Sequence, residues 1–218
     1  MRKSILIAIA LIVTVGAIAV FGSLAMTARD QSALQTAIAA NSQALYRDSA
    51  TPVLGDPDGD VTLVIFSDYN CPDCRKADPA VEKLLADGGK LRVVMKELPI
   101  MGQDSEMVAR LALAADAQGQ YASLHRKLFQ TKGRATPTRA QRYAKELGLD
   151  LPALVETANS QAVLDALDKN RRLAEALGVP GVPFFLVGDK RVTEGDDLYD
   201  KLKAAVADIR ENGGTAAF

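Results

Sequence analysis

The first hydrophobic feature of the chain is an uninterrupted apolar stretch at its amino end. Residues 5–28 contain no charged side chain, and Arg2 and Lys3 precede them. As an α-helix, this stretch would extend ~36 Å, which is enough to cross the hydrocarbon core of a bilayer. It also ends in small residues that suit cleavage of a secretory signal after Ala25. The pattern predicts a signal peptide or a retained membrane anchor in residues 1–28, and an exported remainder in either case.

The next segment has the spacing of an amphipathic helix. Within residues 31–46, the apolar residues Leu34, Ile38 and Leu45 recur at helical intervals with polar residues between them. We expect this helix to lie outside the main domain, in a connecting segment that spans residues 29–50. Two roles fit the pattern: a simple spacer, or a surface through which the protein forms a homo-oligomer.

The compact domain, expected over residues 51–218, begins with a strand. Residues 61–66 form a nearly continuous apolar, β-branched run, which is typical of a strand covered on both faces. A helical pattern follows Cys74 and stops at Gly88, and residues 91–95 predict a second strand. Because a helix between two such strands makes a right-handed crossover, the strands should be parallel and covered by helices.

The remainder of the chain predicts a large helical insertion followed by a hairpin. Residues 103–178 are helical in pattern almost throughout, and Thr136 and Ser160 are suited to cap two of the helices. Residues 184–187 and 191–193 predict two short strands joined by a tight turn, and a last helix follows them. The fold class is therefore α/β.

Composition and charge exclude several kinds of function. The 218 residues are 48% hydrophobic and 24% charged, the balance of an ordinary globular protein. Lysine plus arginine total 26 against 27 for aspartate plus glutamate, so the net charge of −1 argues against nucleic-acid binding. The two cysteines and the one histidine cannot complete a closed structural zinc site, so we expect no metal.

The chemistry is expected in the motif Cys71-Pro72-Asp73-Cys74, which lies between the first strand and its helix. Two thiols three positions apart at a helix start can close a disulfide with little motion, and the first can present its sulfur to solvent. The helix N-terminus stabilises a thiolate on Cys71, which makes Cys71 the attacking sulfur and Cys74 the resolving one. Pro72 suits the first helical position. Such exchange needs no organic cofactor.

The cysteine pair has two alternative roles besides thiol exchange. A purely structural disulfide would stabilise the fold little, because a four-residue loop restrains the unfolded chain little. Half of a metal site is the remaining alternative.

A second motif, Gly178-Val179-Pro180-Gly181-Val182-Pro183, precedes the strand at residue 184. With it, the chain resembles the thioredoxin superfamily and, within it, the DsbA-like periplasmic thiol oxidoreductases, ScsC-like relatives included. The matching segments are residues 66–74, 96–100 and 181–185. The resemblance covers about residues 51–212 and implies a thioredoxin fold with an inserted all-helical subdomain. It also implies that Pro183 is cis and faces the cysteines, and that Val182 offers backbone groups to a substrate strand.

The resemblance further implies substrates and partners. The substrates would be unfolded or misoxidised exported proteins, in the periplasm or at the outer face of the cytoplasmic membrane. An oxidase-type enzyme, which we expect, would be reoxidised by a DsbB-like membrane partner. A disulfide isomerase or reductase would instead be kept reduced by a DsbD-like partner and would benefit from oligomerisation through residues 31–46. A non-enzymatic holdase that binds peptides near Val182 and Pro183 is a third alternative.

Two positions depart from the family pattern. Ile65 stands where many relatives carry a buried carboxylate that relays protons, and Asp73 stands where strongly oxidising relatives carry histidine. A carboxylate at that place disfavours the Cys71 thiolate, so we expect a weaker oxidant than the DsbA archetype. His125 is expected to be structural or on the surface rather than a catalytic base, and Lys96 to be solvated.

Overall fold

The computed structural model describes residues 30–87 and 89–212, and the chain divides into two units after Ala40. In the first unit, residues 30–40 are helical. The predicted signal or anchor in residues 1–28 lies outside the described residues. Within the described part of the chain, none of the helices combines the length and the apolar character that a membrane crossing requires.

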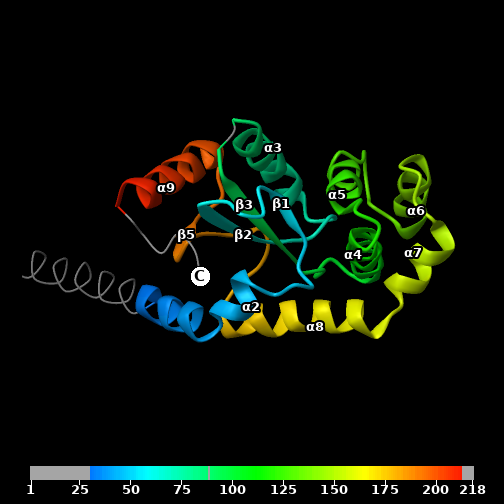
Figure 1. The fold of residues 1–218 in the computed structure, drawn as a ribbon, viewed down its shortest axis with the longest axis horizontal. Helices are drawn as coiled ribbons and strands as arrows, with labels where there is room; N and C mark the ends of the chain where they lie inside the picture. Colours follow the sequence, from blue (N-terminus) through cyan, green and yellow to red (C-terminus); the bar gives the residue numbers. More distant parts are fainter. Residues whose placement is uncertain (1–29, 88, 213–218) are drawn as a thin grey trace, which may run out of the picture. The chain divides into compact units, whose positions relative to one another are not determined.

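The second unit is organised around a mixed five-stranded sheet with the order β1-β3-β2-β4-β5 (Figure 1). The strands are β1 (Val53–Gly55), β2 (Val61–Ser67), β3 (Leu91–Glu97), β4 (Phe184–Val187) and β5 (Lys190–Val192). The central strands β2 and β3 are parallel, as predicted, and the other neighbouring pairs are antiparallel. Strand β1 was not expected, because its three residues lie in a segment rich in turn-forming residues.

Helices cover both faces of the sheet and form a separate group beside it (Figure 1). They are α2 (Ser42–Tyr46), α3 (Pro72–Ala86), α4 (Gln103–Asp116), α5 (Tyr121–Phe129), α6 (Pro137–Glu146), α7 (Leu151–Ala158), α8 (Gln161–Ala176) and α9 (Leu198–Asn212). Helices α3 and α9 pack together on one face, and α2 and α8 cover the other. Helices α4 to α7 pack on one another in the connection between β3 and β4. The predicted α/β class is confirmed.

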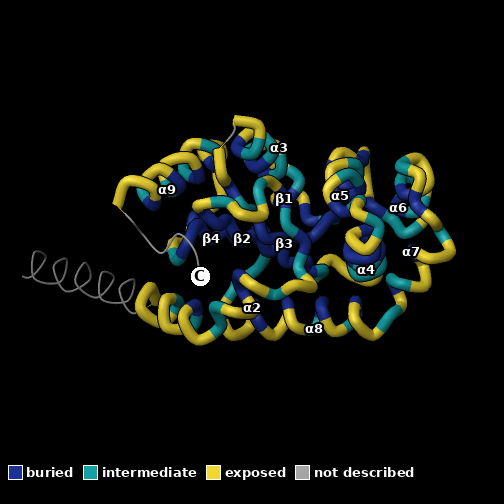
Figure 2. Tube along the Cα trace, in the orientation of Figure 1, coloured by how far each residue is buried: buried dark blue, intermediate teal, exposed yellow. Residues whose placement is uncertain are grey.

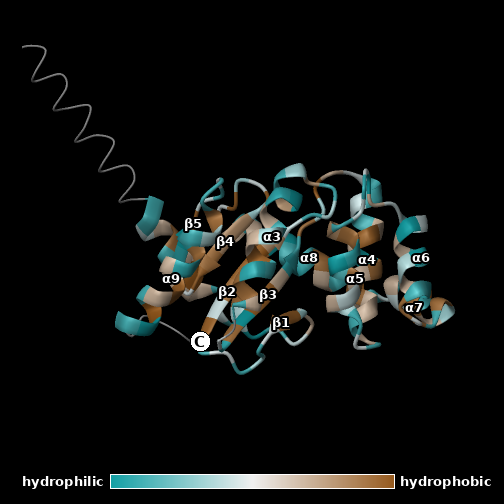
Figure 3. Cartoon of the chain, turned by 90° about the horizontal axis from the view of Figure 1, so that it is seen from above, coloured by the Kyte–Doolittle hydropathy of each residue, from teal (hydrophilic) through white to brown (hydrophobic). Residues whose placement is uncertain are grey.

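Burial on both faces explains the apolar run of the first strand. All seven residues of β2 are buried, and Figures 2 and 3 show buried, hydrophobic strands at the centre of the unit. Phe66 on the α2 and α8 side packs edge-on against Phe184 of β4, with ring centroids 6.1 Å apart. Leu63 and Ile65 point to the opposite side and join the core beneath α3, because successive strand residues alternate between faces.

One predicted helix is interrupted. The helical pattern of residues 31–46 breaks at Asn41, and the second part, α2, belongs to the compact unit rather than to an external spacer. The Tyr46 hydroxyl donates a hydrogen bond to the Gly188 carbonyl oxygen at 2.8 Å, which ties α2 to the end of β4. Helical spacing alone could not distinguish a helix on the domain from one beside it.

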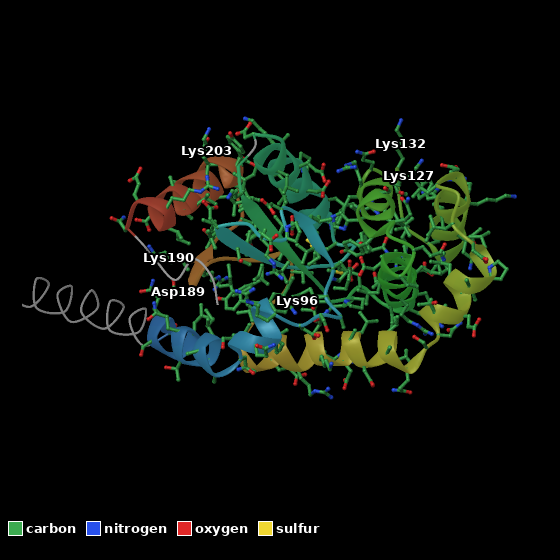
Figure 4. The ribbon with its side chains drawn as sticks, in the orientation of Figure 1. Lys96, Lys127, Lys132, Asp189, Lys190 and Lys203 are labelled. Atoms are coloured by element: carbon green, nitrogen blue, oxygen red, sulfur yellow. The ribbon has the colours of Figure 1, made fainter. Side chains whose placement is uncertain are left out.

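Lys96 is buried, so the expectation of a solvated lysine was wrong. Its ammonium group donates hydrogen bonds to the Ala44 carbonyl oxygen at 2.7 Å and to Thr51 Oγ1 at 2.8 Å. Figure 4 places Lys96 beside α2, on the sheet face opposite to α3. Burial lowers the pKa of Lys96 to about 8. The residue therefore anchors α2 and lies away from the cysteine motif.

Candidate active site

The cysteine motif forms the start of α3, as the sequence predicts. Cys71 is the N-cap residue, and its sulfur accepts a hydrogen bond from the Cys74 backbone N–H at 3.5 Å. Pro72 occupies the first helical position, where its missing N–H leaves no hydrogen bond unmade. Pro72 and Asp73 are both exposed. Both cysteines are free thiols.

The second motif faces Cys71. The Cys71 Sγ donates a hydrogen bond to the Val182 carbonyl oxygen at 3.3 Å, and the Val182–Pro183 peptide bond is cis. The resemblance to the thioredoxin superfamily implied both the cis bond and the facing position. The expectation that Cys71 presents its sulfur to solvent was wrong, because the residue is only 2% exposed. The segment carrying Val182 packs against the sulfur, a long-range contact that local sequence could not show.

Asp68 holds the backbone around the motif. Its carboxylate is buried and accepts hydrogen bonds from three backbone N–H groups: Asn70 at 2.7 Å, and Ile100 and Met101 at 2.8 Å each. Its carbonyl oxygen accepts another from the Cys71 N–H at 3.1 Å. One side chain therefore fixes the loop before α3 and the loop after β3 relative to each other.

A small cavity lies behind Cys74. It is lined mainly by apolar side chains and also by three titratable groups: Cys74, Asp78 and His125. Its volume of about 20 Å³ admits one water molecule. Burial raises the pKa of the Cys74 thiol well above its ordinary value, and hydrogen bonds from the Asp68 backbone and the Ser67 side chain offset only part of that effect. At neutral pH Cys74 therefore keeps its proton.

Asp78 and His125 face each other in this cavity. His125 Nε2 lies 3.9 Å from Asp78 Oδ1. Burial lowers the pKa of His125 to about 3, so the ring is neutral and the contact is not an ion pair. Burial and the nearby charge of Glu82 raise the pKa of Asp78 to about 7, against an opposing effect of Arg126.

A buried hydrogen-bond network surrounds His125. The Tyr69 and Tyr121 hydroxyls both donate to Glu97 Oε1, at 2.7 and 2.6 Å, and burial raises the pKa of Glu97 to about 7. His125 Nδ1 lies 2.9 Å from the Tyr69 hydroxyl oxygen. When Glu97 is ionised, both tyrosine protons point to it and Nδ1 is the donor in this contact; when Glu97 is protonated, Tyr69 can donate to Nδ1 instead. Nε2 of His125 faces Asp78.

Most of this buried polar cluster was not expected from the sequence. His125, expected to be structural or on the surface, is buried at 3% exposure beside the cavity. No role was expected for Asp78 or Glu97. Asp78 lies four residues after Cys74 on one helix, a spacing that brings side chains together and that could have identified it. Among the described residues, no group of His, Cys, Asp or Glu side chains is arranged to hold a metal ion.

Comparisons with known proteins agree with this architecture. The family model described as DSBA-like thioredoxin domain matches residues 62–207. A thioredoxin-like oxidoreductase from Silicibacter pomeroyi is 39% identical with a TM-score of 0.73, over 78% of this chain and 97% of that one. The thiol-disulfide exchange protein alpha-DsbA2 from Wolbachia pipientis is 26% identical with a TM-score of 0.74, over 83% of this chain and 97% of that one.

One similar curated protein is much longer than this chain. The Na(+)/H(+) antiporter NhaA 3 of Salinispora tropica is 32% identical over 170 residues, which make up 74% of this chain and 26% of the antiporter. The chain thus spans about a quarter of the length of this relative.

Proposed function

The chain belongs to the DSBA-like thioredoxin domain family, a family of thiol–disulfide oxidoreductases, and we propose that it exchanges disulfides with exported proteins through Cys71 and Cys74. The proposal rests on the contact between two motifs that are distant in the sequence. Two free thiols lie at the start of α3, and the sulfur of Cys71 contacts the Val182 carbonyl oxygen beside a cis proline. A backbone acceptor next to the sulfur suits alignment of an extended substrate strand.

The proposed reaction proceeds through a mixed disulfide. In the reducing direction, the Cys71 thiolate attacks a substrate disulfide, and one substrate sulfur leaves as a thiolate. Cys74 then attacks Cys71 Sγ, so the bond between Cys71 and the substrate breaks and the Cys71–Cys74 disulfide forms. Two electrons pass from the cysteine pair to the substrate. The oxidising direction is the reverse of these steps. The helix N-terminus at Cys71 stabilises the attacking thiolate.

The proposed direction is oxidation, with a DsbB-like membrane partner that restores the disulfide. The exposed carboxylate of Asp73 favours a second candidate, an isomerase or reductase kept reduced by a DsbD-like partner, because negative charge near the Cys71 thiolate disfavours the reduced form. In both cases we place the enzyme in the periplasm or at the outer face of the cytoplasmic membrane. Residues 1–28 would serve as signal or anchor, and residues 31–46 could join copies in an oligomer.

The reduction potential of the cysteine pair tests the direction. The purified protein is equilibrated against mixtures of reduced and oxidised glutathione, and its free thiols are counted by alkylation. A value near about −120 mV, the benchmark for DsbA, would support an oxidase. A value near about −180 mV or below, the range of protein disulfide isomerase, would contradict it in favour of isomerisation or reduction. A protein with no redox equilibrium between Cys71 and Cys74 would refute the proposed function itself.

Replacing Asp73 should change the reduction potential mainly through the charge of the side chain, because the side chain is exposed. We expect Asp73→His to raise the potential by tens of millivolts, since ~30 mV corresponds to ~1.4 kcal/mol for a two-electron couple. Asp73→Asn, which removes the charge without adding an opposite one, should give a smaller rise. Equilibration against glutathione measures both variants. An unchanged or lower potential in Asp73→His would contradict the effect assigned to Asp73.

A further inference from the structure

The cavity behind Cys74 contains a carboxylate that the reaction as described above does not use. Asp78 lines the cavity together with Cys74, and most other lining side chains are apolar. Ile65, which also lines it, comes from β2 and offers no ionisable group. The acidic group of the cavity therefore comes from α3, the helix that also carries Cys74.

Cys74 needs a proton acceptor to react. Only a thiolate attacks a disulfide, yet burial holds Cys74 in its protonated form at neutral pH. With Cys74 only 3% exposed, bulk solvent has little access to its proton. The acceptor must therefore lie within the cavity or reach it through a water molecule.

Asp78 is the cavity group that can accept this proton. Residues four apart on a helix bring their Cβ atoms within about 5–6 Å, and a cavity that admits one water spans the remaining distance. With a pKa of about 7, Asp78 changes its protonation state at physiological pH. His125 stays neutral, and Glu97 does not line the cavity.

We propose that the Asp78 carboxylate exchanges a proton with the Cys74 thiol across this cavity. This inference rests on the proposed function of the cysteine pair. When Cys74 attacks the mixed disulfide, its proton passes to Asp78, the Cys71–Cys74 bond forms, and the substrate sulfur leaves. In the oxidising direction, the Cys74 thiolate released from the disulfide takes the proton back from Asp78.

Burial and then the charged groups around Asp78 determine the pH at which the exchange occurs. On α3, Glu82 raises the pKa of Asp78, and on α5, Arg126 lowers it. These two residues pair with each other, with Arg126 Nε 3.0 Å from Glu82 Oε2. His125 on α5 is neutral, and the cavity residues contributed by β2, β3 and β4 are not titratable. Resolution by Cys74 should therefore become faster as the pH rises through about 7, where Asp78 loses its proton.

The two steps of the reaction can be timed separately. Reduced protein is mixed with one equivalent of Ellman's reagent in a stopped-flow spectrophotometer. Attack by Cys71 releases a first coloured thiolate, and resolution by Cys74 releases a second. In wild-type protein, the rate of the second phase should rise with pH through about 7. In Asp78→Asn, the first phase should remain, while the second should be at least about tenfold slower at alkaline pH and lose this rise.

Two further variants separate a proton acceptor from a structural residue. Asp116→Asn removes a carboxylate at the end of α4 whose pKa burial also raises, but which does not line the cavity, so both phases should match the wild type. Glu82→Gln keeps Asp78 and should move the rise of the second phase to lower pH, because the Glu82 charge raises the pKa of Asp78.

Each outcome decides a different claim. A second phase in Asp78→Asn with the wild-type rate and pH profile would overturn the assignment of Asp78. If Asp78→Asn folds poorly, an unmoved profile in Glu82→Gln would overturn it equally well. Absence of the first phase in the wild-type protein would instead refute attack by Cys71, and with it the proposed function.

Discussion

Cys71→Ala should abolish disulfide exchange, whereas Cys74→Ala should stop it halfway. Without Cys71 no covalent intermediate can form, and loss of the nucleophile in other covalent enzymes lowers kcat by as much as ~10⁶. Cys74→Ala keeps the attacking sulfur at the N-cap of α3 but cannot release the substrate. We therefore expect it to accumulate a mixed disulfide with roughly one substrate chain per protein.

The experiment mixes each variant with a disulfide-bonded polypeptide and follows reduction, with the covalent complex measured by non-reducing electrophoresis and mass spectrometry. Both cysteines are buried and small, so alanine at either place should leave the fold intact, and a circular dichroism spectrum serves as the control. Exchange by Cys71→Ala at the wild-type rate would contradict the assignment. If both variants bind unfolded polypeptides as well as the wild type but none forms a covalent complex, the holdase alternative is favoured.

The strand–helix–strand start of the domain could be predicted because its signals are local. Each of these signals is set by residues that are close together in the sequence. The structure confirms the apolar strand β2, the proline after Cys71, and the N-caps at Thr136 and Ser160. The helix α7 is capped by Asp150, which accepts a hydrogen bond from the Ala153 N–H at 3.0 Å. Such caps are contained within four residues of sequence.

The buried polar groups could not be predicted in the same way, because strand alternation depends on the sheet around it. Lys96 and Glu97 are neighbours in β3 and point to opposite faces, one to α2 and the other to the tyrosines near His125. The resemblance to the family implies a buried carboxylate at position 65, but this chain carries Ile65 there. The acidic group of the cavity comes from a different element, at Asp78. Helical spacing places it near Cys74, and the packing of α3 over the sheet shows that it lines the cavity.

Asp68→Ala should cause a large loss of stability. The carboxylate is 1% exposed and accepts hydrogen bonds from the Asn70, Ile100 and Met101 N–H groups. Alanine leaves all three donors without their acceptor, and each buried, unsatisfied donor costs about 1–3 kcal/mol. The hydrogen bonds from the Ile100 and Met101 N–H groups are only partly buried, so water can replace part of the carboxylate there, and we expect a loss of about 3 kcal/mol.

Urea denaturation of the reduced protein measures this loss, and Asp56→Ala is a matched control. Asp56 also accepts a backbone hydrogen bond two residues ahead, from Asp58 N–H at 2.9 Å, but in an exposed turn, so its loss should be within about 0.5 kcal/mol. Because Asp68 also joins the loop before α3 to the loop after β3, Asp68→Ala should slow attack by Cys71 even at urea concentrations where the protein stays folded. A stability loss below about 1 kcal/mol would mean that water replaces the carboxylate at all three donors, and that other contacts hold Cys71 against Val182.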